Sequence, residues 1–226
     1  AAIAYSDNIY AVKTHLFLGE ETLVNMAARV GIDAPLEAIP SLALGSEEIN
    51  IIEMMQGYAA FANEGYKIEP YLITRVEDMY GNVLYTHSSF KENVLNKSIV
   101  FVLNEMLGNC YAPEMVDYNY PTCINMAPQL THKYAIKTGT TDTDHLIFGY
   151  NKDMLVGVWL GYDDNSKIEV KYGSVNKQIW IDIMENYFKD KEINWYNIPK
   201  NVVGVLVDPI SGKPNPNTSN KNKIFY

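Results

Sequence analysis

The sequence of 226 residues has few cysteines, no long apolar run and no cluster of basic residues. Its two cysteines, Cys110 and Cys123, each lack a second cysteine at the spacing of a metal site. No stretch of 18 or more apolar residues is present, so the chain contains no segment expected to span a bilayer as a helix. Lys and Arg number 18 against 27 Asp and Glu, a net charge of -9, and the basic residues are scattered. Because a phosphate backbone is bound by clustered cations, we expect no nucleic-acid partner.

Neither the two cysteines nor the few clustered acidic residues form a pattern typical of a metal or cofactor site. We therefore expect no cofactor and no metal. We expect Cys110 and Cys123 to be structural or free thiols, and a disulfide closing the loop between them is the alternative. Asp142, Asp144 and His145 lie close in the sequence, but a calcium loop would need further oxygen ligands and a glycine. We therefore expect a solvated loop there.

Apolar residues make up 47% of the chain, enough to form a core, and their spacing mixes helix and strand periods. Ala1–Tyr5 is an apolar, helix-forming run with no N-cap before it, so we expect the chain to begin inside a fold. The pattern predicts one α+β domain in which a mainly antiparallel sheet is flanked by helices. We place it at residues 1–212, followed by a polar, flexible tail at 213–226.

Four further helices are predicted from apolar periodicity and capping residues. Glu20–Val30 should end at Gly31, and a helix capped by Ser46 should end near Gly65, its Met-rich stripe belonging to the core rather than to a binding groove. Asn96 should cap a helix that runs through Leu107. The last helix, near Val175–Phe188, should face the sheet with Ile179, Ile183 and Tyr187.

Strands are predicted mainly in the second half of the chain. The β-rich runs are 134–137, 146–150, 155–160 and 202–207, and a polar turn at 151–153 makes the middle two an antiparallel pair. Between the helices, residues 71–85 should form a hairpin around Gly81-Asn82, a turn pair that accepts positive φ.

Two short motifs carry chemical groups. Lys137-Thr138-Gly139-Thr140 leaves a strand with an ammonium group, two hydroxyls and backbone N–H groups along one edge, which suits a carboxylate. Gly139 lets the backbone of an extended peptide approach this edge. Ser6 and Asn8 offer a proton carrier and an orienting amide that can face the same cleft.

With these motifs, the order of several segments resembles the transpeptidase domain of class A, bifunctional penicillin-binding proteins. Ser-Asp-Asn and Lys-Thr-Gly are two of the motifs of active-site serine penicillin-recognising enzymes. The segments that carry the resemblance are Ala2–Asn8, Pro40–Ser46, Tyr58–Tyr66, Lys137–Thr141 and Val158–Asp163. The chain departs from the family at Asp144–Tyr150, where an aromatic pair of the family is replaced by Leu146-Ile147.

The resemblance implies a β-lactamase/transpeptidase-like fold and roles for six residues. Ser6 would relay protons, Asn8 would orient the substrate amide and Lys137 would supply positive potential. Thr138 and Thr140 would bind the carboxylate of a D-Ala-D-Ala stem peptide or of a β-lactam, with Gly139 between them and the Thr140 N–H in the oxyanion hole. The resemblance implies neither a metal nor a cofactor.

The family also has a Ser-x-x-Lys nucleophile segment before Ser-x-Asn, and none precedes Ser6 here. Ser88-Ser89-Phe90-Lys91 matches the pattern, but it follows Ser-x-Asn and lies in a polar loop. We therefore expect a partial domain, inactive by itself and without a penicillin adduct. Its parent would be membrane-anchored on the extracytoplasmic face, with an N-terminal glycosyltransferase domain, and would cross-link peptidoglycan stem peptides.

Three alternatives remain for the parent protein. A β-lactamase would need a base that activates a deacylating water, and Glu21–Asn25 has suitable residue types but reads as regular helix too soon after Asn8. A D-Ala-D-Ala carboxypeptidase shares the fold and motifs. A non-catalytic scaffold of the wall-synthesis complex is the third, against which the intact Ser6, Asn8 and Lys137 argue.

Overall fold

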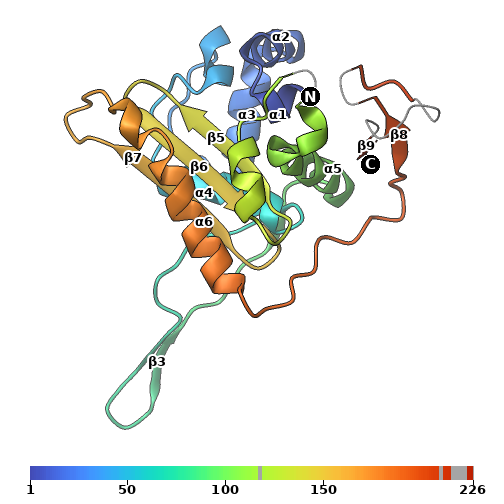
Figure 1. The fold of residues 1–226 in the computed structure, drawn as a ribbon. Coiled ribbons are helices and arrows are strands. Elements are labelled where there is room, and N and C mark those ends of the chain that lie inside the picture. The colour runs from blue at the N-terminus through green and yellow to red at the C-terminus, as the bar shows by residue number, and fades with distance from the viewer. Residues whose placement is uncertain (117–118, 209–210, 215–222, 226) are drawn as a thin grey trace.

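The computed structural model describes residues 1–116, 119–208, 211–214 and 223–225. Its fold mixes helices with antiparallel strands, as the sequence predicts (Figure 1). The helices are α1 (Ala2–Tyr5), α2 (Asn8–Leu18), α3 (Glu20–Val30), α4 (Ile51–Ala62), α5 (Lys97–Leu107) and α6 (Val175–Phe188). Short 3-10 helices are η1 (Pro40–Leu44), η2 (Gly108–Tyr111), η3 (Pro113–Met115), η4 (Ile124–Gln129) and η5 (Val170–Tyr172).

The central sheet has the strand order β5-β6-β7 and is antiparallel throughout. Its strands are β5 (Ala135–Thr140), β6 (Asp144–Tyr150) and β7 (Leu155–Gly161), close to the predicted runs. The turn between β6 and β7 is fixed by Asn151, whose Oδ1 accepts hydrogen bonds of 2.9 Å from the N–H groups of both Asp153 and Met154. An Asx turn of this kind confirms the predicted hairpin.

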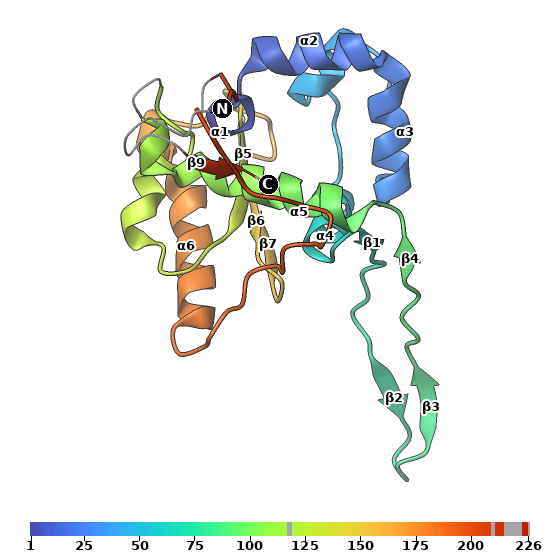
Figure 2. The ribbon, with the colours of Figure 1, turned by 90° about the vertical axis from the view of Figure 1, so that its right-hand side faces the viewer.

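Helices cover both faces of this sheet (Figure 2). On one face α6 buries Trp180, whose Nε1 donates to the Val156 carbonyl at 3.2 Å. On the other face α4 stacks Tyr58 on Phe148, with ring centroids 4.8 Å apart. The hydroxyl of Tyr150 donates to Asn104 Oδ1 of α5 at 2.7 Å, so this buried polar pair is satisfied.

The face of α6 that packs on the sheet differs from the prediction. Ile179, Ile183 and Tyr187 are 41%, 40% and 49% exposed. The buried positions are Trp180, Ile181, Met184 and Phe188. Trp180 decides the orientation, because its indole lies over Gly149, where the missing Cβ leaves room for the largest side chain of the helix.

The helix ends show which capping predictions were right. Gly31 ends α3 in the left-handed conformation (φ 102°), and Asn96 caps α5 by accepting from Ser98 N–H at 2.9 Å. The predicted Ser46 cap is wrong. Helix α4 begins at Ile51 and is capped by Asn50, while Ser46 Oγ donates to Ser41 Oγ at 3.0 Å. Both are good capping residue types, and Asn50 is the one next to the first helical turn.

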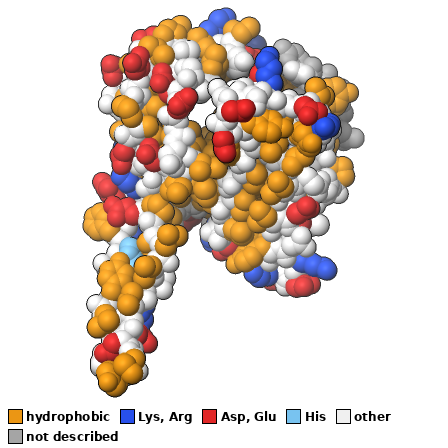
Figure 3. Space-filling model, turned by 90° about the vertical axis from the view of Figure 1, so that its left-hand side faces the viewer, with side chains coloured by type: hydrophobic (Ala, Val, Ile, Leu, Met, Phe, Trp, Pro, Cys, Tyr) orange, Lys and Arg blue, Asp and Glu red, His pale blue; other side chains and the backbone are white. Residues whose placement is uncertain are grey.

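A two-stranded arm, β2 (Arg75–Glu77) and β3 (Val83–Thr86), projects from the body (Figures 1 and 2). It confirms the predicted hairpin with shorter strands, and β1 (Tyr66–Lys67) pairs with β4 (Glu92–Asn93) at its base. Asp78 Oδ1 holds the turn by accepting from Tyr80 N–H at 2.8 Å and Asn82 N–H at 2.9 Å. Hydrophobic side chains gather along the arm and at its tip (Figure 3).

The C-terminal residues include one further pair of short strands. The predicted strand 202–207 is limited to β8 (Val205–Val207), which pairs with β9 (Lys223–Phe225). Lys213 also accepts a hydrogen bond of 2.9 Å from Asp208 N–H. Within the tail predicted at 213–226, residues 213–214 and 223–225 thus pair through their backbones with the segment at 205–208. Residues 215–222 and 226 of the predicted tail lie outside the described residues.

No helix formed by the described part of the chain is long and apolar enough to cross a membrane.

Two glycines of the sheet should respond differently to the same substitution. A Cβ on Gly149 would lie 2.6 Å from Trp180 Cε2, whereas a Cβ on Gly139 would lie 3.6 Å from Leu146 Cβ, an ordinary contact. Gly149→Ala should lower the free energy of unfolding by about 2–3 kcal/mol, because overpacking must displace the indole. Gly139→Ala, the matched control, should change it by less than about 0.5 kcal/mol. Urea unfolding measures both, and equal losses would contradict this packing.

Candidate active site

The structure brings two predicted site residues from distant parts of the chain into contact. Lys137 Nζ donates a hydrogen bond to Ser6 Oγ, across 131 positions of sequence. It donates a second one to the carbonyl of its neighbour Thr138 at 2.7 Å. A proton can pass between an ammonium group and a hydroxyl that are hydrogen-bonded to each other.

Ser6 occupies a sharp corner between α1 and α2. It is the C-cap of α1, with φ 50° and ψ 51°, a left-handed conformation that is unusual for a residue other than glycine. Asp7 caps α2 by accepting from Tyr10 N–H at 2.9 Å, and Asn8 is the exposed first residue of α2. Ser6, Asp7 and Asn8 therefore also form the corner between α1 and α2. Backbone strain such as the left-handed conformation of Ser6 clusters at functional sites.

Helix α1 is too short to hold Ser6 by itself and is held by the segment after η2. The Tyr5 hydroxyl donates to the Met115 carbonyl at 2.6 Å, and Thr122 N–H donates to the Ala4 carbonyl at 3.1 Å. Ala4 is buried against Ala112 and Met115. These contacts set the position from which Ser6 reaches Lys137.

Lys137 lies on β5 with its side chain partly buried. Desolvation lowers the pKa of its ammonium group below the usual 10.5, and the nearby thiols of Cys123 and Cys110 oppose that shift. A lowered lysine pKa makes the neutral amine accessible nearer to neutral pH. Lys137 is thus both a positive charge beside Ser6 and a group able to exchange a proton with it.

The remaining three predicted residues continue along the same strand. Thr138, Gly139 and Thr140 lie at the outer end of β5, where exposure increases toward Thr140. Among the described strands, β5 pairs with β6 alone, so its other edge is available for backbone hydrogen bonds. Gly139 has no side chain to obstruct another backbone that approaches this edge.

The loop after β5 is organised by Asp144, whose contacts sequence reasoning did not find. Asp144 accepts from Trp159 Nε1 at 2.7 Å and from Thr143 Oγ1 at 2.8 Å. These hydrogen bonds lower the pKa of its carboxyl group. Asp142 instead pairs with Lys167, 2.6 Å away. Within the described residues no three His, Cys, Asp or Glu side chains gather as a metal site.

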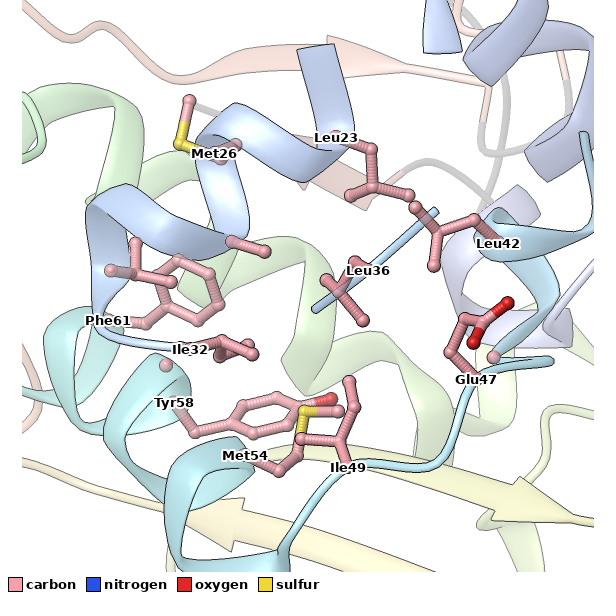
Figure 4. A pocket seen from close by; sticks show the side chains of 14 residues that line it. Leu23, Met26, Ile32, Leu36, Leu42, Glu47, Ile49, Met54, Tyr58 and Phe61 are labelled. Carbon is pink, nitrogen blue, oxygen red and sulfur yellow. The ribbon is translucent and has the colours of Figure 1, made fainter. Parts of the chain in front are cut away.

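An apolar pocket of about 240 Å³ lies between α3, α4 and the segment that joins them (Figure 4). Its lining includes Leu23, Met26, Leu36, Met54, Tyr58 and Phe61. The Met-rich stripe of α4 therefore faces a cavity as well as the core. Burial raises the pKa of Tyr58 to about 12. The lining supplies no pair of groups for acyl transfer comparable to Ser6 and Lys137.

Sequence reasoning also missed a second Ser-x-x-Lys match, Ser174-Val175-Asn176-Lys177. Ser174 is the exposed residue before α6, and Lys177 Nζ donates to the Thr122 carbonyl at 2.8 Å. Scanning every serine for a lysine three positions later would have found it. In this structure Ser174 precedes the first residue of α6, and Lys177 fastens the start of that helix to Thr122.

Comparisons with known proteins show what the chain is similar to. A family model described as penicillin binding protein transpeptidase domain matches residues 1–172. Penicillin-binding protein 2D of Bacillus subtilis (strain 168) is 45% identical over 212 residues, which cover 93% of this chain and 31% of that protein. Penicillin-binding protein 1A of Rickettsia conorii is 26% identical over 231 residues, covering 93% and 29%. The chain thus spans about 30% of the length of these curated relatives.

Solved structures show a similar fold. Penicillin-binding protein 1A from Haemophilus influenzae matches with a TM-score of 0.88 at 21% identity, covering 99% of this chain and 39% of that one. PonA1 from Mycobacterium tuberculosis in complex with penicillin V matches with a TM-score of 0.64 at 19% identity, covering 78% and 52%. Such likeness supports the arrangement of helices around the antiparallel sheet.

The environments of two lysines predict opposite titration shifts. Lys137 should lose its proton below pH 10.5, because desolvation disfavours the charged form, whereas pairing with Asp142 raises the pKa of exposed Lys167. Folding therefore binds fewer protons at Lys137, and its contribution to stability should rise with pH between the lowered pKa and 10.5. NMR titration of ¹³C-labelled lysine side chains measures both midpoints. A Lys137 midpoint at or above that of Lys167 would contradict the burial described here.

Proposed function

Because the chain belongs to the penicillin-binding protein transpeptidase domain family, we propose that it is the part of a peptidoglycan D,D-transpeptidase that binds the donor stem peptide and transfers protons during acyl transfer. The hydrogen bond between Lys137 Nζ and Ser6 Oγ is the observation that carries this proposal. It joins the two predicted motifs in one site, and the partly desolvated amine has a hydroxyl to exchange protons with.

In the proposed reaction a serine of the longer protein attacks the carbonyl of the penultimate D-Ala of a stem peptide. The terminal D-Ala leaves, and an amine of a neighbouring stem peptide resolves the acyl-enzyme. Ser6 carries the proton between the nucleophile and the leaving amine, with Lys137 holding the Ser6 hydroxyl, and Asn8 orients the amide of the substrate. No metal or cofactor is required by these steps.

The open edge of β5 supplies substrate binding in this proposal. The hydroxyls of Thr138 and Thr140 bind the terminal carboxylate of D-Ala-D-Ala or the carboxylate of a β-lactam. Gly139 admits the substrate backbone against the strand, and the Thr140 N–H stabilises the oxyanion. This assignment is supported by the edge of β5 that pairs with no described strand and by the lack of a side chain at Gly139.

We place the acylated serine outside these 226 residues. Ser88-x-x-Lys91 lies between β3 and β4 on the side of the projecting arm, away from α1 and β5 (Figure 2). Ser174 precedes α6, and Lys177 is engaged by the Thr122 carbonyl. The longer protein would carry the nucleophile, a glycosyltransferase domain and a membrane anchor, and would work on the extracytoplasmic face of the membrane.

Benzylpenicillin should acylate the longer protein on a serine outside this chain, because a β-lactam mimics D-Ala-D-Ala and deacylation by water lacks an assigned base. Intact-mass spectrometry followed by peptide mapping locates the adduct. The 226-residue chain alone should gain no mass. An adduct on Ser88 or Ser174 would overturn the placement of the nucleophile, rapid turnover would favour a β-lactamase, and no adduct on a folded protein would favour a scaffold.

Removing the Ser6 hydroxyl should slow acylation of the longer protein about 10²- to 10⁴-fold, the usual contribution of a positioned proton carrier. Ser6→Ala tests this, and Ser6→Gly repeats it with a residue that accepts the left-handed φ at no steric cost. Ser46→Ala is the matched control, because Ser46 is exposed and bonds to Ser41. Rates are measured with a fluorescent penicillin. Unchanged rates in both Ser6 variants would exclude Ser6 from the proton path.

A further inference from the structure

The two cysteines lie side by side in the core beneath the candidate site. Cys110 is in η2 and Cys123 immediately precedes η4, and Cys123 N–H donates to the Cys110 carbonyl at 2.8 Å. Both thiols are unoxidised and buried, with the residues 1% and 0% exposed. This backbone hydrogen bond and their shared buried cluster make the two cysteines close neighbours in space.

The segment between the cysteines holds the helix that carries Ser6. The described residues of this segment are 111–116 and 119–122. The carbonyl of Met115 accepts a hydrogen bond of 2.6 Å from the Tyr5 hydroxyl, and the N–H of Thr122 donates one of 3.1 Å to the Ala4 carbonyl. The two residues after Ala4 are Tyr5 and Ser6. A disulfide between Cys110 and Cys123 would therefore restrict the position of α1.

The same segment is also fixed to the strand that carries Lys137. The Tyr111 hydroxyl donates to the Tyr134 carbonyl at 3.1 Å and accepts from Tyr134 N–H at 3.0 Å. Both cysteines pack with Ile136, the neighbour of Lys137. The cysteine pair thus lies where the supports of Ser6 and Lys137 meet.

The environment makes the two thiols chemically different. Burial raises the pKa of Cys110, whereas the interaction with Cys110 lowers the pKa of Cys123, helped by the charges of Lys177 and Lys137. Cys123 is thus the thiol of the pair with the lowered pKa, and the thiolate is the form that attacks a disulfide.

We propose that Cys110 and Cys123 are a modification site, a dithiol that a small-molecule disulfide converts reversibly into a disulfide clasp holding α1 and Ser6 against β5. With oxidised glutathione, the Cys123 thiolate attacks one sulfur and expels a glutathione thiolate. Cys110, after losing its proton to that thiolate, attacks Cys123 Sγ and expels the second glutathione. Two electrons pass from the protein to the oxidant, which leaves as two reduced glutathione molecules.

The experiment treats the folded chain with oxidised or reduced glutathione, unfolds it and labels free thiols with N-ethylmaleimide. The reduced protein should take two labels and the oxidised protein none, with a mass about 2 Da lower and one linked peptide pair in a digest. Because both sulfurs are buried, the reaction needs local opening of the segment and should take minutes to hours. None of these readouts depends on penicillin binding.

A clasp should also stabilise the fold. Closing a loop of this length should raise the midpoint of thermal unfolding by roughly 5–10 °C. Cys110→Ser and Cys123→Ser are the matched controls, each able to form at most a mixed disulfide and expected to show no rise. Cys110→Ala and Cys123→Ala repeat the test if a buried serine impairs folding.

Three results would overturn the proposal. The first is that both labels remain after oxidation of the wild-type chain under conditions that permit local opening. The second is that glutathione is attached to each cysteine with no linked peptide pair. The third is a linked pair whose unfolding midpoint is unchanged or lowered, which would mean that the link strains the segment.

Discussion

The hydrogen bond between Lys137 and Ser6 is the contact on which the rest of the site depends. It forms only when α1 is seated beside β5, and these two elements are far apart in the sequence. A partly desolvated ammonium group needs an acceptor, because the protein gives it fewer water molecules than bulk solvent does. The Ser6 oxygen and the Thr138 carbonyl are those acceptors, so electrostatics and chain geometry favour the same arrangement.

The sheet and its two helical layers make this arrangement rigid. On one face the Trp180 indole fills the space over Gly149, and on the other Tyr58 stacks on Phe148. Both contacts fix β6, the strand that gives β5 its register. Because close-packed interiors transmit small displacements, the position of Lys137 is determined by packing well away from its own side chain.

Local signals predicted much of the fold, and competition between similar signals explains the errors. The Asn96 cap, Gly31 and the turn after Tyr150 each act within a few residues, and all three appear where expected. The Ser46 cap failed because Asn50 offers the same chemistry closer to the helix. The face of α6 could not be chosen from periodicity alone, since two adjacent apolar stripes exist and the fit to Gly149 selects one. Within the site, the motifs predicted that Ser6 and Lys137 are close, but not the left-handed corner at Ser6 or the bond between Trp159 and Asp144.

The projecting arm has a consequence for how the protein behaves in solution. Its β2–β3 ribbon pairs with no third described strand, so the outer edges expose backbone donors and acceptors, and Met79 and Tyr80 at its tip are 88% and 81% exposed. Such edges are templates on which strands of other molecules add. The net charge of -9 keeps copies apart by repulsion, and salt screens that repulsion. The ionic strength of the buffer therefore sets the colloidal stability of the protein, independently of the stability of its fold.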